Sequence, residues 1–138
     1  MFVLDPRLAG DTAPIGDLPL SRVLLMNDAR FPWLILVPRQ PGLRDLTDLA
    51  RNDQHALLDE INRCAHVLRA LAKPDKLNVA SLGNIVAQLH VHVIARHTTD
   101  AAWPRPVWNH GEREAYADAA LHARVAALRT ALHIDCGA

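Results

Sequence analysis

The most constraining feature of this chain is a run from Gln88 to Arg96 (QLHVHVIAR) in which hydrophobic and polar side chains alternate. Successive side chains of a β-strand point to opposite faces of a sheet, so this period of two predicts a strand. One face would be lined by leucine, valine and alanine, and the other would present Gln88, His90, His92 and Ile94. Imidazoles act as nucleophiles, proton carriers and metal ligands at neutral pH. The two histidines are therefore the leading candidates for the chemistry of the protein.

Composition narrows the class of protein. The chain has 138 residues, half of them hydrophobic, which is the size of one ordinary domain with a substantial core. Fifteen basic and fifteen acidic side chains cancel, so the chain lacks the electrostatic signature of binding to nucleic acid or to an anionic membrane. Cys64 and Cys136 show no zinc-binding spacing, and the N-terminus lacks the apolar stretch of a signal peptide. We expect one cytoplasmic domain over residues 1–138.

Patterns around the histidine run predict the other elements. Three further strands are expected, at residues 21–26, 33–37 and 76–81. Apolar residues recur at spacings of three and four over residues 45–72, which is typical of an amphipathic helix. A polar stretch at 51–54 divides this region into a short turn and a longer helix that begins near residue 52 and ends at Lys73-Pro74.

The flanking regions complete the expected fold. Residues 1–20 contain three prolines and predict an irregular arm with a short strand, residues 97–111 a loop, and residues 112–132 a C-terminal helix. The order strand, strand, helix, strand, strand, helix predicts an α+β domain, with an antiparallel sheet, a long helix packed on one face and a C-terminal helix. The imidazole face would then be open to a ligand.

One segment, Gly83–Ile94 (GNIVAQLHVHVI), resembles the signature of the histidine triad (HIT) family. In that signature three histidines alternate with hydrophobic residues after a Gly-Gln-Ser/Thr lead-in. Leu34–Arg39 resembles the family's strand that ends in proline and a basic residue. The resemblance covers about residues 20–100 and is closest to a bacterial subgroup with Gln-Leu-His-Val-His and a downstream Trp-Pro loop. It implies the HIT fold and a homodimer, with the C-terminal helix or the region of Trp33 as the interface.

The resemblance implies nucleotidyl transfer to water. His90, at the middle triad position, would attack the α-phosphorus of a dinucleoside polyphosphate, a nucleoside phosphoramidate or an acyl-adenylate. Water would then release the nucleotide from a covalent nucleotidyl-histidine. The backbone carbonyl of Gln88 would accept the Nδ1–H of His90 and leave Nε2 facing the substrate. His92, Gln88 and Asn84 would position phosphate oxygens.

The resemblance also implies where the rest of a nucleotide would lie. Asn27 or Asp28 would bind the ribose, and the spacing does not choose between them. Leu24 and Leu25 would line the base pocket. No cofactor is required, and magnesium would enter only with a polyphosphate substrate.

Residues that follow the histidine run would complete the site. Arg96 and His97 would bind a polyphosphate tail. Trp103 and Trp108 would stack on a base or leaving group, although loop tryptophans more often serve as packing anchors.

Three departures from the signature keep alternatives open. Gln88 replaces a histidine and cannot carry a proton at neutral pH, Ile85 replaces a hydroxyl residue, and Asn84 replaces a glutamine. One alternative is therefore a nucleotide-binding regulatory protein with weak or lost catalysis. Another is a metal site in which His97 or His110 joins the two strand histidines.

Overall fold

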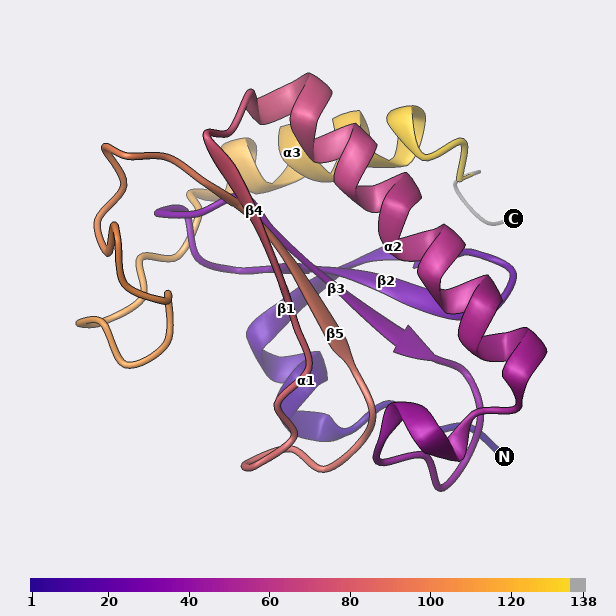
Figure 1. Cartoon of the computed structure of the whole chain (residues 1–138). Coiled ribbons are helices and arrows are strands. Elements are labelled where there is room, and N and C mark those ends of the chain that lie inside the picture. Colours follow the sequence, from indigo (N-terminus) through magenta and orange to yellow (C-terminus); the bar gives the residue numbers. More distant parts are fainter. Residues whose placement is uncertain (135–138) are drawn as a thin grey trace.

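The computed structural model describes residues 1–134, so Cys136 lies outside the described residues. Five strands form one antiparallel sheet in the order β1-β2-β3-β5-β4 (Figure 1). The strands are β1 (Thr12–Asp17), β2 (Ser21–Met26), β3 (Trp33–Pro38), β4 (Lys76–Ala80) and β5 (Val91–Arg96). The predicted α+β architecture with an antiparallel sheet is confirmed.

The structure contains three α-helices and one 3-10 turn within residues 1–134, and residues 45–72 divide into a short turn and a long helix, as predicted. These elements are α1 (Pro6–Asp11), the 3-10 turn η1 (Leu46–Asp48), α2 (Arg51–Ala72) and α3 (Asp118–Ala131). At the end of α2, Lys73 adopts a left-handed conformation and its N–H donates to the Arg69 carbonyl, which closes the helix. No helix in residues 1–134 is both long and apolar enough to span a bilayer.

One face of the sheet packs against α2 and α3, which lie on the same side of it in Figure 1. Alternate residues of the central strands supply this core, and each is fully buried: Val23, Leu25, Leu34, Leu36, Val93 and Ala95. Burying one aliphatic side chain of this size stabilises a fold by about 1.5–3 kcal/mol. The long helix therefore packs on the predicted face of the histidine strand.

The opposite face is partly covered by α1 and by part of the loop after β5, so the expected open imidazole face is reduced to a cavity that the histidines line. Leu8 of α1 and Val107 of the loop pack in one cluster with Trp33, Ile35 and Ile94. The prediction for residues 1–20 missed this helix but included a strand, which is β1. A six-residue helix shows too little periodicity to be recognised.

The sequence does contain a signal for the start of α1, which the proline-rich composition of residues 1–20 hides. The carboxylate of Asp5, at the N-cap, accepts the backbone N–H of Arg7 at 2.8 Å, and Pro6 occupies the first turn. An acidic N-cap followed by proline is a typical helix start, because the cap satisfies a free N–H and proline has none to satisfy.

The histidine strand is shorter than predicted. β5 begins at Val91, which pairs with Leu36 of β3, so the expectation of a strand over 88–90 was wrong. Beyond Pro38 the neighbouring chain turns away, and the Leu89 N–H donates instead to the carbonyl of Leu43 at 3.0 Å. Residues 88–90 therefore lie in a loop that leads into the strand.

The C-terminal helix also begins later than predicted, at Asp118 rather than near residue 112. The backbone N–H groups of Glu114 and Tyr116 donate to the side chains of Asp28 and Asn27, at 3.3 and 2.9 Å. These bonds hold residues 112–117 in a non-helical conformation against the β2–β3 turn.

The loop after β5 is anchored by a buried ion pair. Arg96 is only 1% exposed and donates to both carboxylate oxygens of Asp100, at 2.8 and 3.0 Å. Asp100 also accepts the backbone N–H groups of three loop residues: His97, Ala102 and Trp103. Burial alone would raise the pKa of Asp100, but these hydrogen bonds outweigh it and lower the pKa to about 2.

Replacing Asp100 should weaken the fold in a pH-dependent way. A carboxyl whose pKa falls on folding stabilises the folded chain above its unfolded pKa, and this contribution disappears as the pH falls through the folded value. We expect Asp100→Asn to lower the free energy of unfolding at pH 7 by about 2 kcal/mol. It should also flatten the dependence of stability on pH between about 4 and 2.

Urea unfolding at a series of pH values measures both effects. Asp59→Asn, at an exposed position of α2, is the control and should change stability by less than about 0.5 kcal/mol. Equal losses in the two variants would contradict the anchoring role of Asp100.

Candidate functional site

The two histidines of the motif lie side by side at the start of β5. Their ring centroids are 4.9 Å apart, both side chains are buried, and both reach a cavity of about 320 Å³. Five segments of the chain form its other walls: α1, the strands β2 and β3, and the loops at 82–86 and 108–109. The lining residues are Arg7, Leu8, Asp11, Met26, Ile35, Leu82, Gly83, Asn84, Ile85, Val86, Trp108 and Asn109.

His90 is oriented by the main chain. Its Nδ1 lies 2.6 Å from the carbonyl oxygen of Gln88. A carbonyl can only accept, so Nδ1 carries the proton and Nε2 keeps its lone pair. The predicted contact between this nitrogen and the carbonyl of the first motif position is confirmed.

His92 is oriented in the opposite sense by an aromatic donor. The indole Nε1–H of Trp33 donates to Nδ1 of His92 at 3.0 Å. An indole can only donate, so Nδ1 of His92 is unprotonated and the proton of the neutral ring lies on Nε2. Burial, and to a lesser extent the charge of His90, lower the pKa of His92 to about 3. His92 is therefore a neutral hydrogen-bond donor at ordinary pH.

Aromatic rings hold this pair in place. The ring of Trp108 packs edge-on against His92, with centroids 5.0 Å apart, and against Trp33 at 5.9 Å. Perpendicular contacts of this kind are favourable between aromatic rings. Of the two loop tryptophans singled out by sequence, Trp108 lies at the histidines.

Gln88 does not line the cavity. Its side-chain oxygen accepts the backbone N–H of Asp5 at 2.8 Å, and its side-chain nitrogen donates to the carbonyl of Val3 at 2.8 Å. The expectation that Gln88, His90 and His92 share one face of a strand was wrong, because Gln88 and His90 precede β5. The two histidines nevertheless lie side by side at the cavity, whereas Gln88 does not reach it.

Asn84 does lie at the cavity, as expected for a residue that positions phosphate oxygens. Its neighbour Ile85 is 83% exposed at the rim. The guanidinium of Arg7 donates to the Ile85 carbonyl at 2.9 Å. This loop and α1 are therefore linked across the mouth of the cavity.

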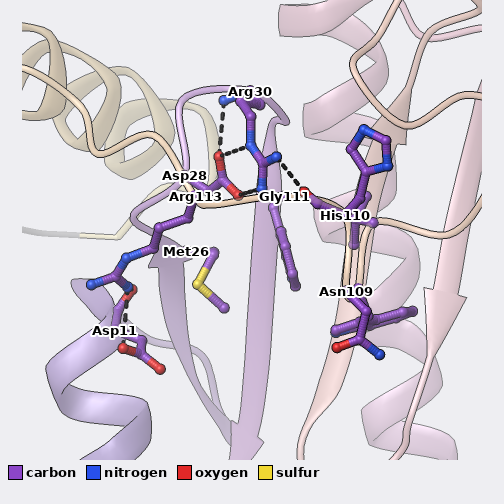
Figure 2. A pocket seen from close by; sticks show the side chains of 11 residues that line it. Asp11, Met26, Asp28, Arg30, Asn109, His110, Gly111 and Arg113 are labelled. Atoms are coloured by element: carbon purple, nitrogen blue, oxygen red, sulfur yellow. Dashed lines mark hydrogen bonds and ion pairs between the residues drawn. The ribbon is translucent and has the colours of Figure 1, made fainter.

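Asn27 and Asp28, the candidates for ribose binding, hold the protein itself together. The side chain of Asn27 accepts the Tyr116 N–H. Asp28 forms an ion pair with Arg30, whose guanidinium also donates to the His110 carbonyl (Figure 2). Burial alone would raise the pKa of Asp28, but the hydrogen bonds from Arg30 and Glu114 keep it below its ordinary value.

The Asp28–Arg30 pair lines a second cavity of about 250 Å³ next to the first. The two cavities share four residues: Asp11, Met26, Trp108 and Asn109. Figure 2 shows one of them, Asp11, paired with Arg113 in the second cavity. Of the two ribose candidates, Asp28 alone lines one of the two described cavities, and it is not the one that holds the histidines.

Arg96 and Trp103 lie away from the histidines. The guanidinium of Arg96 donates hydrogen bonds to Asp100, Asn78 and the Arg105 carbonyl. It also lies 5.7 Å from the centroid of the Trp103 ring. Neither residue lines a described cavity, so the expectation of a polyphosphate contact at Arg96 and a stacking surface at Trp103 is not supported. His97 also points elsewhere, with Nε2 2.7 Å from the Ala72 carbonyl.

The apolar wall of the cavity differs from the predicted one. Leu25 faces the core under α2 and α3, and Leu24 is buried in the opposite layer. Leu8, Met26 and Ile35 line the cavity instead. Ile35 pairs directly with His92, so alternation along β3 was the signal that could have placed it on the histidine face.

The alternative of a metal site at the two histidines finds no complete set of ligands in the described residues. Within residues 1–134, no three His, Cys, Asp or Glu side chains are grouped closely enough to hold a metal ion. In particular, His110 lines the second cavity and His97 bonds to the end of α2.

The bond from Trp33 to His92 leads to a spectroscopic prediction. Trp33→Phe keeps an aromatic ring but removes the donor that stabilises neutral His92, so the pKa of His92 should rise from about 3. The imidazole should also populate both tautomers. Nitrogen-15 NMR of the histidine rings across pH measures both changes.

Trp108→Phe is the matched control, because Trp108 contacts His92 through ring packing alone in the described chain. It should leave the tautomer of His92 unchanged. An unchanged tautomer and pKa in Trp33→Phe would contradict the orienting role of the indole.

Comparisons with known structures show which proteins share this fold. A histidine triad protein from Bradyrhizobium japonicum is 49% identical, with a TM-score of 0.92 over 95% of this chain and 98% of that one. A histidine triad protein from Sinorhizobium meliloti is 43% identical, with a TM-score of 0.91 over 94% and 96%. One from Marinobacter aquaeolei is 43% identical, with a TM-score of 0.93 over 96% and 97%.

The family comparison covers the same elements. A search of curated proteins gave no significant match. The HIT domain model matches residues 9–99, which span β1 to β5 and include both histidines. The chain therefore belongs to the HIT domain family.

Proposed function

We propose that this protein is a nucleotidyl hydrolase or transferase in which Nε2 of His90 attacks the α-phosphorus of a nucleotide conjugate. The observation that carries the proposal is the 2.6 Å contact between Nδ1 of His90 and the Gln88 carbonyl. Because Nδ1 carries the proton, the nucleophilic lone pair is on Nε2, and the ring of His90 lines the cavity. Membership of a family that includes nucleotide hydrolases and transferases supports the same assignment.

The reaction would proceed in two displacements. The lone pair of His90 Nε2 forms a P–N bond while the bond from phosphorus to the leaving group breaks, and the leaving group departs with the electron pair. Water then attacks phosphorus and releases a proton to solvent, and the P–N electrons return to Nε2 as its lone pair. The intermediate ring carries a positive charge, which the Gln88 carbonyl stabilises through Nδ1–H.

His92 and Asn84 would stabilise the phosphate during both steps. The Nε2–H of neutral His92 is a fixed donor beside His90, and the Asn84 amide lies at the same cavity. Donors held in place before the reaction favour the transition state of phosphoryl transfer, which is mainly a matter of positioning and charge stabilisation.

The chemistry of the leaving group narrows the substrate class. His92, with a pKa of about 3, carries no extra proton to give at neutral pH, and a glutamine amide cannot act as an acid. Leaving groups that depart as stable anions suit this site, namely the polyphosphate of a dinucleoside polyphosphate or the carboxylate of an acyl-adenylate. A phosphoramidate, whose amine must be protonated, should react more slowly. Any magnesium ion would arrive with the polyphosphate.

Turnover by the wild type and His90→Asn tests the proposal. The wild type should release nucleoside monophosphate from diadenosine polyphosphate and acyl-adenylate faster than from adenosine phosphoramidate. His90→Asn keeps a hydrogen-bonding side chain but has no nucleophilic nitrogen, so release should fall by at least about 10³-fold.

Intact-mass analysis under alkaline quench should find a nucleotidyl adduct, since a P–N bond hydrolyses in acid, and peptide mapping under the same conditions should locate it on His90. Nucleotide binding without any turnover would instead favour the regulatory function. An adduct on another residue would refute the assignment of His90.

The expected homodimer fits one exposed feature of the sheet. β4 is an edge strand, and Val79 is 50% exposed although its partner Val93 is buried. An unpaired edge with an exposed valine suits pairing with a second copy. Trp33 lies inside the protein against His92, so it supplies no such surface.

Sedimentation velocity at micromolar concentration tests this interface. The wild type should sediment as a dimer and Val79→Asp as a monomer, because a carboxylate placed at the edge opposes pairing. Leu46→Asp, at another exposed hydrophobic position, is the control and should remain dimeric. A monomeric wild type would contradict the proposal.

A further inference from the structure

Gln88 joins the nucleophile to the N-terminal arm, which we define as residues 2–11. Its backbone carbonyl orients His90, whereas its side chain binds two backbone groups of the arm. In an extended chain the C=O of one residue and the N–H of the second residue along point the same way. The amide of Gln88 therefore pairs with Val3 and Asp5 as the peptide of a neighbouring strand would.

The arm is one wall of the histidine cavity. Arg7, Leu8 and Asp11 of α1 line it. Leu8 is buried, and Arg7 reaches the carbonyl of Ile85 on the opposite side of the mouth. Arg7 is itself held by both carboxylate oxygens of Asp5.

The connection between the arm and the motif loop runs through few groups. In the described chain, the side-chain hydrogen bonds between the arm and residues 83–90 are the two from Gln88 and the one from Arg7 to Ile85. Asp5 takes part in both links, because its N–H binds Gln88 and its carboxylate fixes Arg7. Loss of the amide at position 88 would leave the arm attached to this loop mainly through Arg7.

We propose that Gln88 is a positioning residue that holds the N-terminal arm as a wall of the substrate cavity, and that it does not contact the substrate. The effect of Gln88 on substrate binding rests on the proposed function, whereas its effect on the position of the arm does not. Both polar groups of the side chain are already satisfied by Val3 and Asp5. A histidine at this motif position would instead be a titratable group two residues from the nucleophile.

Hydrogen exchange of the ligand-free protein tests the positioning role without any substrate. Gln88→Leu keeps the size of the side chain and the backbone carbonyl that orients His90 but removes both polar groups. Exchange in peptides from residues 2–11 should rise by about tenfold or more, because two hydrogen bonds are lost. Gln54→Leu removes a similar bond, from its amide to the Leu49 carbonyl, and should leave the arm unchanged.

A double-mutant cycle on substrate binding then separates the two roles of Gln88. Leu8→Ala weakens the docking of the arm independently of Gln88. If Gln88 acts through the arm, each variant should raise KM with little change in kcat, and the double variant should be little worse than the worse single one. If Gln88 contacts the leaving group, Gln88→Leu should lower kcat and its effect should multiply with that of Leu8→Ala.

The outcomes distinguish this proposal from the proposed function. Unchanged exchange in residues 2–11 of Gln88→Leu would overturn the positioning role, whatever the activity. Increased exchange in a protein that hydrolyses none of the nucleotides would support the positioning role and refute the hydrolase. Multiplying effects on kcat would overturn the claim that Gln88 does not contact the substrate. Thermal unfolding of each variant checks that the rest of the fold is intact.

Discussion

The site depends on two hydrogen bonds that assign protons to two adjacent imidazoles in opposite ways. A carbonyl fixes the proton of His90 on Nδ1, and an indole N–H excludes it from Nδ1 of His92. Each partner can act only as acceptor or only as donor, so each bond fixes which nitrogen carries the proton of the neutral ring. One ring is left with a lone pair and its neighbour with an N–H, which are the two functions that a displacement at phosphorus requires.

This arrangement relies on the register of the sheet. Ile35 pairs with His92 across β3 and β5, and Trp33 lies two residues earlier on the same face, within reach of the imidazole. A shift of one residue would send Trp33 into the core below α2 and α3. The aliphatic layer on that side fixes the register, so the packing of the hydrophobic core determines the protonation of a polar residue on the other side.

Alternation and helical periodicity were sufficient to predict most of the fold. They located strands β2, β3 and β4 and the division between η1 and α2. The contact between His90 and the Gln88 carbonyl was expected only from the resemblance to the HIT family. These features are local, or they follow from a repeated pattern. The assignments that failed concern side chains whose partners the local pattern does not identify, whether these lie near in sequence or far away.

Gln88 illustrates the difference. It bonds to Asp5 across 83 residues, and nothing in the pattern QLHVH distinguishes an amide that faces a phosphate from one that binds a backbone. Arg96 is similar, since a basic residue at the end of a strand resembles an anion ligand until Asp100 folds back onto it. The β2–β3 turn was correctly placed, but the side chains of Asn27 and Asp28 proved to hold residues 114–116.

Those contacts to residues 114–116 also bear on when the second cavity can form during synthesis. The turn that borders this cavity is held by backbone groups that follow it by eighty residues or more. A nascent chain that has emerged only as far as the histidines can pair its strands but lacks Trp108 and the segment that holds the turn. Such late, non-local closure slows the final step of folding relative to the local helices. A ligand would then bind only after synthesis of the chain is complete, and binding would stabilise the folded contacts between the first and last thirds of the sequence.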